Sequence, residues 1–116
     1  MRDVNKWLEE ALRELKLPCS EEPMRESACP DGYITWKMVR EKLLYASGKP
    51  WQRQVTADVS LWLPGDADWQ DVYGRAQWLL MQEGAWSMVL KSADWLGDMQ
   101  LRRVVLRVQL PPEVAA

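Results

Sequence analysis

The chain has 116 residues, of which 47% are hydrophobic and 28% charged, a composition typical of a single folded domain with a real core. Its formal net charge is -2, so it lacks the basic surface expected of a nucleic-acid-binding protein. It contains eight Trp but no His, which excludes the commonest activating base of Ser and Cys nucleophiles and the commonest ligand of catalytic zinc.

The N-terminal segment predicts an amphipathic helix over about residues 3–16, which Pro18 ends. Its apolar residues recur at i, i+3 and i+4 spacing and are expected to form one stripe: Val4, Trp7, Leu8, Ala11, Leu12 and Leu15. The acidic stretch that follows, CSEEPMRESACPDG, contains Pro and Gly residues and predicts a loop.

Cys19 and Cys29, the two thiols of the chain, lie ten positions apart. Two thiols alone cannot complete a tetrahedral zinc site. A disulfide is conceivable, but the charged N-terminal segment does not resemble a secretory signal, and reduced structural thiols are the expectation. No run reaches the ~18 apolar residues that span a membrane, so we expect a soluble, cytoplasmic protein.

Two alternating segments predict the first pair of strands. In GYITWKMVR, the expected inward residues are Ile34, Trp36 and Met38, and the outward ones are Tyr33, Thr35, Lys37 and Val39. In VTADVSLWLP, one face carries Val55, Ala57, Val59, Leu61 and Leu63, and the other carries Thr56, Asp58, Ser60 and Trp62.

The connector between these strands, residues 41–54, is long and apolar. Connections between adjacent strands are usually a few polar residues. This connector holds Leu43, Leu44, Tyr45 and Trp51. Because its own domain offers no obvious place to bury them, the connector predicts a contact with a partner.

The dipeptide PG ends the second strand, and Asp66 or Asp68 is expected to cap a second helix. That helix presents an apolar stripe: Trp69, Val72, Tyr73, Ala76, Leu79 and Leu80. Gly84 fits the left-handed position at its C-terminus, and Gly74 within it suggests a close approach by a neighbouring element.

Two further strands complete the chain. AWSMVLKSADW predicts a third strand with Trp86, Met88 and Leu90 inward, and MQLRRVVLRVQL predicts a fourth with Val104, Leu106, Val108 and Leu110 inward. The order α-β-β-α-β-β predicts an α+β fold, a two-layer sandwich with a mainly antiparallel four-stranded sheet and both helices on one face. The residues expected to be buried together are Trp36, Val59, Tyr73, Trp86 and Leu106.

The opposite, outer face of this sheet is mixed in character. It is expected to carry Tyr33, Lys37, Asp58, Trp62, Val89, Leu101, Arg103, Val105 and Arg107. A sheet face open to water is normally more polar, and large exposed apolar patches usually mark interaction sites, although single surface hydrophobes are tolerated. We therefore predict a subunit or partner interface comprising Leu43, Leu44, Tyr45, Trp51, Trp62, Val89, Leu101, Arg103, Val105 and Arg107.

No pattern indicates catalysis. The carboxylates of LEEAL, SEEP and DADWQD are typical of a helix face, a loop and a helix N-terminus. Alternation along RRVVLR places Arg102 on the face opposite Arg103 and Arg107, and the glycine of SGKP lacks the spacing of nucleotide-binding motifs. We predict no catalytic, metal or cofactor site, and an enzyme with an acidic site has the least support.

The order of these segments resembles a known family. An amphipathic N-terminal helix, an acidic loop, a YITW strand, an LYASGKP connector, a VTADVSLW strand, a helix and a closing hairpin are together similar to small tail-completion proteins of long-tailed bacteriophages. These are the tail terminator, or tail-to-head joining, proteins, which are also found in prophages. The resemblance covers about residues 15–110 and depends on the order of short motifs more than on any single one.

This resemblance implies a structural virion protein. Such proteins form a homo-oligomeric ring, commonly a hexamer, on the finished tail tube, where the ring stops polymerisation of the major tail tube protein and offers a surface to the head completion or connector protein. It implies a place at the head-proximal end of the tail, assembly in the host cytoplasm, DNA contact only by passage through the ring, and no membrane. The competing interpretation is a small α+β adaptor domain, monomeric or dimeric, that binds one cellular partner.

Overall fold

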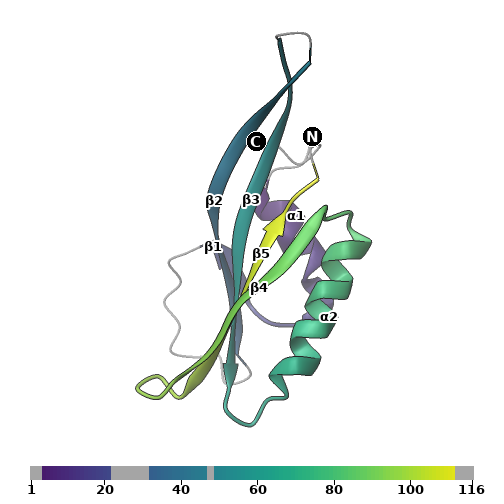
Figure 1. The fold of residues 1–116 in the computed structure, drawn as a ribbon. Helices are drawn as coiled ribbons and strands as arrows, with labels where there is room; N and C mark the ends of the chain where they lie inside the picture. The colour runs from purple at the N-terminus through teal and green to yellow at the C-terminus, as the bar shows by residue number, and fades with distance from the viewer. Residues whose placement is uncertain (1–3, 22–31, 47–48, 112–116) are drawn as a thin grey trace.

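The structure is a computed structural model that describes residues 4–21, 32–46 and 49–111; within these ranges the side chains of residues 20–21, 41–46 and 49–53 are not described. The elements in chain order are α1 (Val4–Ala11), the 3-10 helix η1 (Arg13–Leu15), β1 (Cys19–Glu21), β2 (Tyr33–Ala46), β3 (Lys49–Pro64), α2 (Trp69–Gln82), β4 (Ser87–Leu96) and β5 (Leu101–Gln109). Figure 1 shows two helices beside one twisted sheet, which confirms the predicted α+β class. Among the described residues, neither α-helix is long and apolar enough to cross a bilayer.

The sheet has five strands in the order β1-β2-β3-β5-β4. All neighbouring pairs are antiparallel except β1 and β2, which run parallel and pair Cys19 with Ile34. The prediction of four strands and an α-β-β-α-β-β order omitted β1, because its three residues fall in the segment expected to be a loop and are too few to show a periodic pattern. The Ile34 N–H donates to the carbonyl of Pro18 at 2.8 Å, which extends this pairing by one bond.

The predicted connector, residues 41–54, is not a loop: β2 and β3 stay paired as far as Ala46 and Lys49. β5 pairs with β3 only up to Thr56, and β1 pairs with a short part of β2. The two strands therefore continue beyond the sheet as a two-stranded ribbon, here called the arm (residues 41–46 and 49–54), which projects from the body in Figure 1. The side chains of Leu43, Leu44, Tyr45 and Trp51 lie outside the described part of the molecule.

The N-terminal helix is shorter than predicted, because α1 ends at Ala11 and the chain continues through a turn into η1. Lys16 closes η1 in the left-handed conformation (φ 57°). Five residues of the predicted stripe, Val4, Trp7, Leu8, Ala11 and Leu12, are nevertheless no more than 5% exposed, and the sixth, Leu15, is partly buried. Trp36 Nε1 donates to Asn5 Oδ1 at 2.7 Å, which ties α1 to β2.

Both predicted ends of α2 are confirmed. Asp68 is the N-cap, and its side chain accepts a hydrogen bond from the Asp71 N–H at 3.3 Å. At the other end Gly84 has a φ of +98°, and the Ala85 N–H donates to the Leu80 carbonyl at 3.1 Å. This six-to-one hydrogen bond after a left-handed glycine is the Schellman ending, which few residues other than glycine allow.

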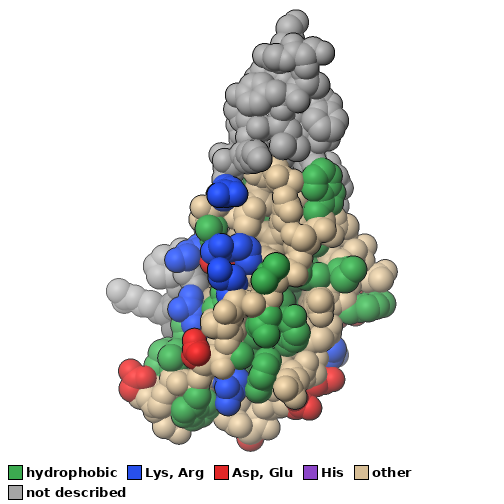
Figure 2. All heavy atoms as spheres, viewed as in Figure 1, with side chains coloured by type: hydrophobic (Ala, Val, Ile, Leu, Met, Phe, Trp, Pro, Cys, Tyr) green, Lys and Arg blue, Asp and Glu red, His purple; other side chains and the backbone are tan. Residues whose placement is uncertain are grey.

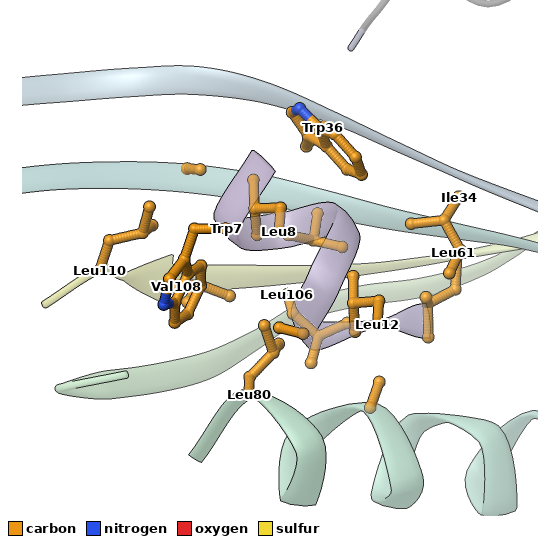
Figure 3. Close-up of a cluster of buried hydrophobic side chains, with 14 of the residues drawn as sticks. Trp7, Leu8, Leu12, Ile34, Trp36, Leu61, Leu80, Leu106, Val108 and Leu110 are labelled. Carbon is orange, nitrogen blue, oxygen red and sulfur yellow. The ribbon is translucent and has the colours of Figure 1, made fainter. Parts of the chain in front are cut away.

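One core cluster contains buried side chains of α1 and α2 together with inward residues of β2, β3 and β5. Figure 3 shows its labelled side chains pointing toward one another from α1, α2, β2, β3 and β5. The inward residues predicted for the second and fourth strands are no more than 1% exposed: Val55, Ala57, Val59, Leu61, Leu63, Val104, Leu106, Val108 and Leu110. Burial of each large side chain contributes about 1.5–3 kcal/mol, so this cluster dominates the stability of the domain.

The predicted burial of Trp86 is wrong, because its side chain is 54% exposed. Leu90, from the same face of β4, is exposed as well. β4 is an edge strand, and α2 lies against α1, η1 and β5 more than against β4, so the inner face of β4 is left partly uncovered. In the rest of the predicted group, Trp36, Val59 and Leu106 are buried and Tyr73 is partly buried.

Two smaller predictions also fail. Met38 was expected to be buried but is exposed, because it lies where β2 leaves the body to form the arm. Gly74 was expected to permit a close approach, yet a Cβ added there would meet nothing within 4 Å.

Candidate partner interface

The outer face of the sheet carries side chains in rows that cross β2, β3, β5 and β4. Residues directly opposite in an antiparallel pair point to the same face, so the register defines each row. One row joins Tyr33, Trp62, Arg103 and Asp94; the next joins Thr35, Ser60, Val105 and Ser92; a third joins Lys37, Asp58, Arg107 and Val89. Alternation in the sequence predicted most of these positions on this face.

The first row is an aromatic stack flanked by a cation. The rings of Tyr33 and Trp62 are parallel to within 11°, and the Arg103 guanidinium lies 4.7 Å from the centroid of the Trp62 ring. Trp62 Nε1 donates to Thr35 Oγ1 at 2.9 Å. Tyr33 is only 7% exposed as a result, although it lies on the outer face. Trp62 is therefore held in one orientation with its polar edge hydrogen-bonded.

Polar contacts attach β5 to β3 along the same face. Arg107 forms a two-point pair with Asp58, with Nε–Oδ1 at 2.9 Å and Nη2–Oδ2 at 3.2 Å. The hydrogen bond to Asp58 raises the pKa of the Arg107 guanidinium, which is charged at any physiological pH. Arg103 Nε donates to Ser60 Oγ at 3.3 Å. Both arginines are thus positioned by β3.

A depression of about 560 Å³, here called the sheet depression, opens on this face where the arm leaves the body. It is lined by Val39, Arg40, Gln54, Thr56, Ser87, Val89, Arg107 and Gln109. Its described lining includes two arginines and no carboxylate, and the side chain of Val89 is 57% exposed. In the view of Figure 2, several Lys and Arg side chains lie along the left of the coloured surface, with apolar side chains beside them. The depression thus offers positive charge and apolar surface together.

The predicted interface residues are distributed along this face. Trp62 and Arg103 meet in the aromatic row, and Val89 lies opposite Arg107 at the sheet depression. Val105 is partly buried between these two regions, whereas Leu101 lies at the far end of β5, opposite Pro64. The four predicted residues of the arm have a described backbone only.

Sequence reasoning missed most of the lining of the sheet depression, and Arg40 above all. Strict alternation from Tyr33 would turn Arg40 inward, but a bulge between Met38 and Arg40 places it opposite Thr56 on the outer face. The sequence did contain a signal for this bulge. Regular alternation would bury the charge of Arg40, which is costly, and one extra residue in the strand turns Arg40 outward instead.

A second depression, here called the helix depression, lies between η1 and α2 and has a volume of about 390 Å³. It is lined by Glu14, Gln70, Asp71, Gly74, Arg75, Trp78 and Leu79. Trp78 is 60% exposed beside it. No sequence pattern marked Trp78, because it lies outside the apolar stripe of α2.

Within the described ranges, no three Cys, Asp or Glu side chains come close enough to hold a metal ion. Cys19 is a free thiol whose Sγ donates to the Leu17 carbonyl at 3.2 Å. Burial, and then the charge of Glu9, raises the pKa of Cys19 from 9.0 to about 11, so the thiol is protonated and weakly nucleophilic at neutral pH.

Similarity to known proteins does not assign the chain to a family. No protein-family model matches the sequence, and no curated protein matches it significantly. The described features from which a function can be argued are the arm, the outer face of the sheet and the two depressions.

Proposed function

We propose that this chain is a structural virion protein that caps the finished tail tube of a long-tailed phage as an oligomeric ring. The ring stops polymerisation of the major tail tube protein and presents a surface to the head completion or connector protein. It acts at the head-proximal end of the tail, after assembly in the host cytoplasm. The resemblance of the sequence to tail terminator proteins suggests this role, and the arm supports it.

The arm is the observation that carries the proposal. Over residues 41–46 and 49–54, β2 and β3 pair with each other and, in the described chain, with no third strand. A two-stranded ribbon is at best marginally stable alone in water. The molecule is also elongated, with extents of 52 × 25 × 22 Å. A ribbon that extends this far from its core gains stability from contact with a neighbouring subunit or with the tube.

The proposal includes the arrangement of layers. In it, both helices cover the inner face of the sheet, and the outer face is left for partners. The shared core cluster supports this arrangement, since it contains side chains of α1 and α2 together with the inward residues of β2, β3 and β5. A closed ring, commonly a hexamer in such proteins, would join unlike surfaces of successive subunits and leave a channel for DNA.

The alternative is an adaptor domain, monomeric or dimeric, that binds one cellular partner through its outer face. One observation favours it. Trp62, the largest aromatic of that face, already contacts Tyr33 and Arg103 within its own subunit. The sheet depression is then the main feature of that face left for a partner, as in a domain with a single ligand.

Shortening the arm tests the proposal. Replacing residues 43–53 with Asn-Gly would close the hairpin at the Lys42–Gln54 pair with a favoured two-residue turn. The body should still fold, because every described member of the core cluster lies outside the arm. We expect the wild type to form rings by light scattering and to cap purified tail tubes, and the shortened variant to do neither. A wild type that stays monomeric at every concentration and leaves tubes uncapped would contradict the proposal.

A further inference from the structure

We propose that successive copies of this chain join head to tail, with the sheet depression of one copy against the helix depression of the next. The inference rests on the proposed ring and specifies the contact that builds it. The occupant of each depression is thus a second copy of this chain.

Charge is the first reason for this pairing. Among the side chains that the structure describes, the register places four cations, Lys37, Arg40, Arg103 and Arg107, and two carboxylates, Asp58 and Asp94, on the outer face. This positive face belongs to a chain with a net charge of -2. The helix depression has the opposite sign, because Glu14 and Asp71 outnumber Arg75 in its lining. Patches of opposite charge steer association and fix its orientation.

Exposed apolar side chains lie beside both depressions. Trp78 borders the helix depression, and Val39 and Val89 line the sheet depression. Single exposed hydrophobic side chains are ordinary on a monomer. Here, however, they line two depressions whose charges are opposite in sign. Tryptophan is also among the side chains enriched at the centre of protein interfaces. Contact between the depressions would remove all three side chains from water.

Gly74 provides a second, independent reason. Glycine disfavours a helix interior, and a Cβ atom added at this position would meet nothing within 4 Å outside the backbone of its own helix. Packing within the subunit therefore does not require glycine here, in contrast to Gly84, whose φ of +98° does. Gly74 leaves the helix depression open beside Trp78, where a side chain of the next copy would enter.

The two depressions lie on different surfaces, so the contact is heterologous. A two-fold dimer formed through one depression alone would place that patch against itself and bring like charges together. A head-to-tail contact uses both patches of every subunit, as a closed ring requires. This geometry leaves the arm available for the tube or for the neighbouring subunit.

A charge exchange tests the pairing. The test uses Arg40 because Arg107 is already paired with Asp58. Arg40→Glu and Glu14→Lys alone should each weaken self-association of the full chain by more than about tenfold, since like charges would then face each other across the contact. An equal mixture of the two variants should assemble. When the two variants alternate along the assembly, every contact joins residues of opposite charge. Light scattering and sedimentation measure both results.

Two controls isolate the effect of the contact. Asp98→Lys changes the net charge as Glu14→Lys does, but lies in the exposed turn between β4 and β5, and Arg40→Lys keeps the charge. Both should assemble like the wild type. If the wild type assembles and the single reversals assemble equally well, the head-to-tail pairing is wrong while the ring remains. If the wild type neither assembles nor caps tubes, the ring itself fails.

Gly74→Leu supplies a test that does not depend on charge. Leucine favours the helix and has open space at this position, so the melting temperature of the subunit should stay the same or rise. The added side chain would fill the helix depression, and association should weaken by about tenfold or more. A variant that is as stable as the wild type and assembles equally well would overturn the inference.

Discussion

The rings of Tyr33 and Trp62 stack with their centroids 5.5 Å apart and their planes 11° from parallel. The two residues lie directly opposite each other on β2 and β3. This contact fills one end of the outer face, whereas the sheet depression lies toward the other end, near Arg40 and Gln109. One face of the sheet thus has a packed end and an open end.

Trp62→Ala should lower the free energy of unfolding by about 2–3 kcal/mol. It removes the stack on Tyr33, the cation–π contact with Arg103 and the hydrogen bond to Thr35. Trp62→Phe keeps a ring and loses the hydrogen bond, so it should cost about half as much. Urea unfolding measures both, and equal stability of Trp62→Ala and wild type would show that the stack does not contribute.

Trp86→Ala should change the free energy of unfolding by less than about 1 kcal/mol, because this side chain is mostly in water. The matched change is Trp36→Ala, which removes a buried ring hydrogen-bonded to Asn5 and should cost about 3–5 kcal/mol. Thermal unfolding of the two variants gives the comparison. A larger loss at Trp86 than at Trp36 would mean that the inner face of β4 is covered.

Asp68→Ala should destabilise the protein by about 1 kcal/mol, since its carboxylate caps the N-terminus of α2. Asp66→Ala changes the same charge two residues earlier and should be nearly neutral. Asp68→Asn should also be mild, because asparagine caps well. Circular dichroism during urea unfolding measures the stability of all three variants. Equal effects of Asp66→Ala and Asp68→Ala would show that the lost charge, and not the lost N-cap, causes the destabilisation.

Cys19 should react slowly with thiol reagents. Burial raises its pKa from 9.0 to about 11, so its thiolate fraction near neutral pH is about 100-fold lower than that of an ordinary thiol. Cys29→Ser leaves Cys19 as the single thiol, and its alkylation rate in the folded and urea-unfolded chain provides the measurement. Equal alkylation rates in the folded and the unfolded chain would refute the raised pKa of Cys19.

The same pKa shift predicts how stability depends on pH. The folded state favours the neutral thiol. The contribution of Cys19 to the free energy of unfolding is therefore complete below about pH 9 and is lost as the pH rises toward 11. The comparison is between Cys29→Ser and the same chain with Cys19→Ala added. The stability difference between them should stay constant up to pH 8 and change between pH 9 and 11; a change at lower pH would assign the titration to another group.

The inner faces of the central strands were predictable because alternation is unbroken there. From Val55 to Leu63, and again from Val104 to Leu110, each inward position is apolar and buried. The arm was not predictable, since residues 41–54 lack alternation and only their pairing with each other makes them strands. The predicted burial of Trp86 was wrong for a related reason. Burial at an edge strand depends on where α2 packs, and no local pattern specifies that position.

The candidate site was predictable only in part. Alternation placed Trp62, Arg103 and Arg107 on the correct face, and their register partners confirm it. It could not predict that a bulge brings Arg40 to the same face. The helix depression depends on η1 lying beside α2, a tertiary contact that the apolar stripes leave undefined.

The bulge in β2 sets the direction in which the arm leaves the body. Without Val39, the pairs Met38–Ala57 and Arg40–Thr56 would follow each other in a regular ladder, and the ribbon would lose the local twist that a bulge adds. The arm acts as a lever: six residues at about 3.3 Å each make it roughly 20 Å long. A rotation of about 20° at its base would move its tip by about 7 Å. Inserting or deleting one residue at this bulge would therefore change the direction of the arm while leaving every core side chain in place.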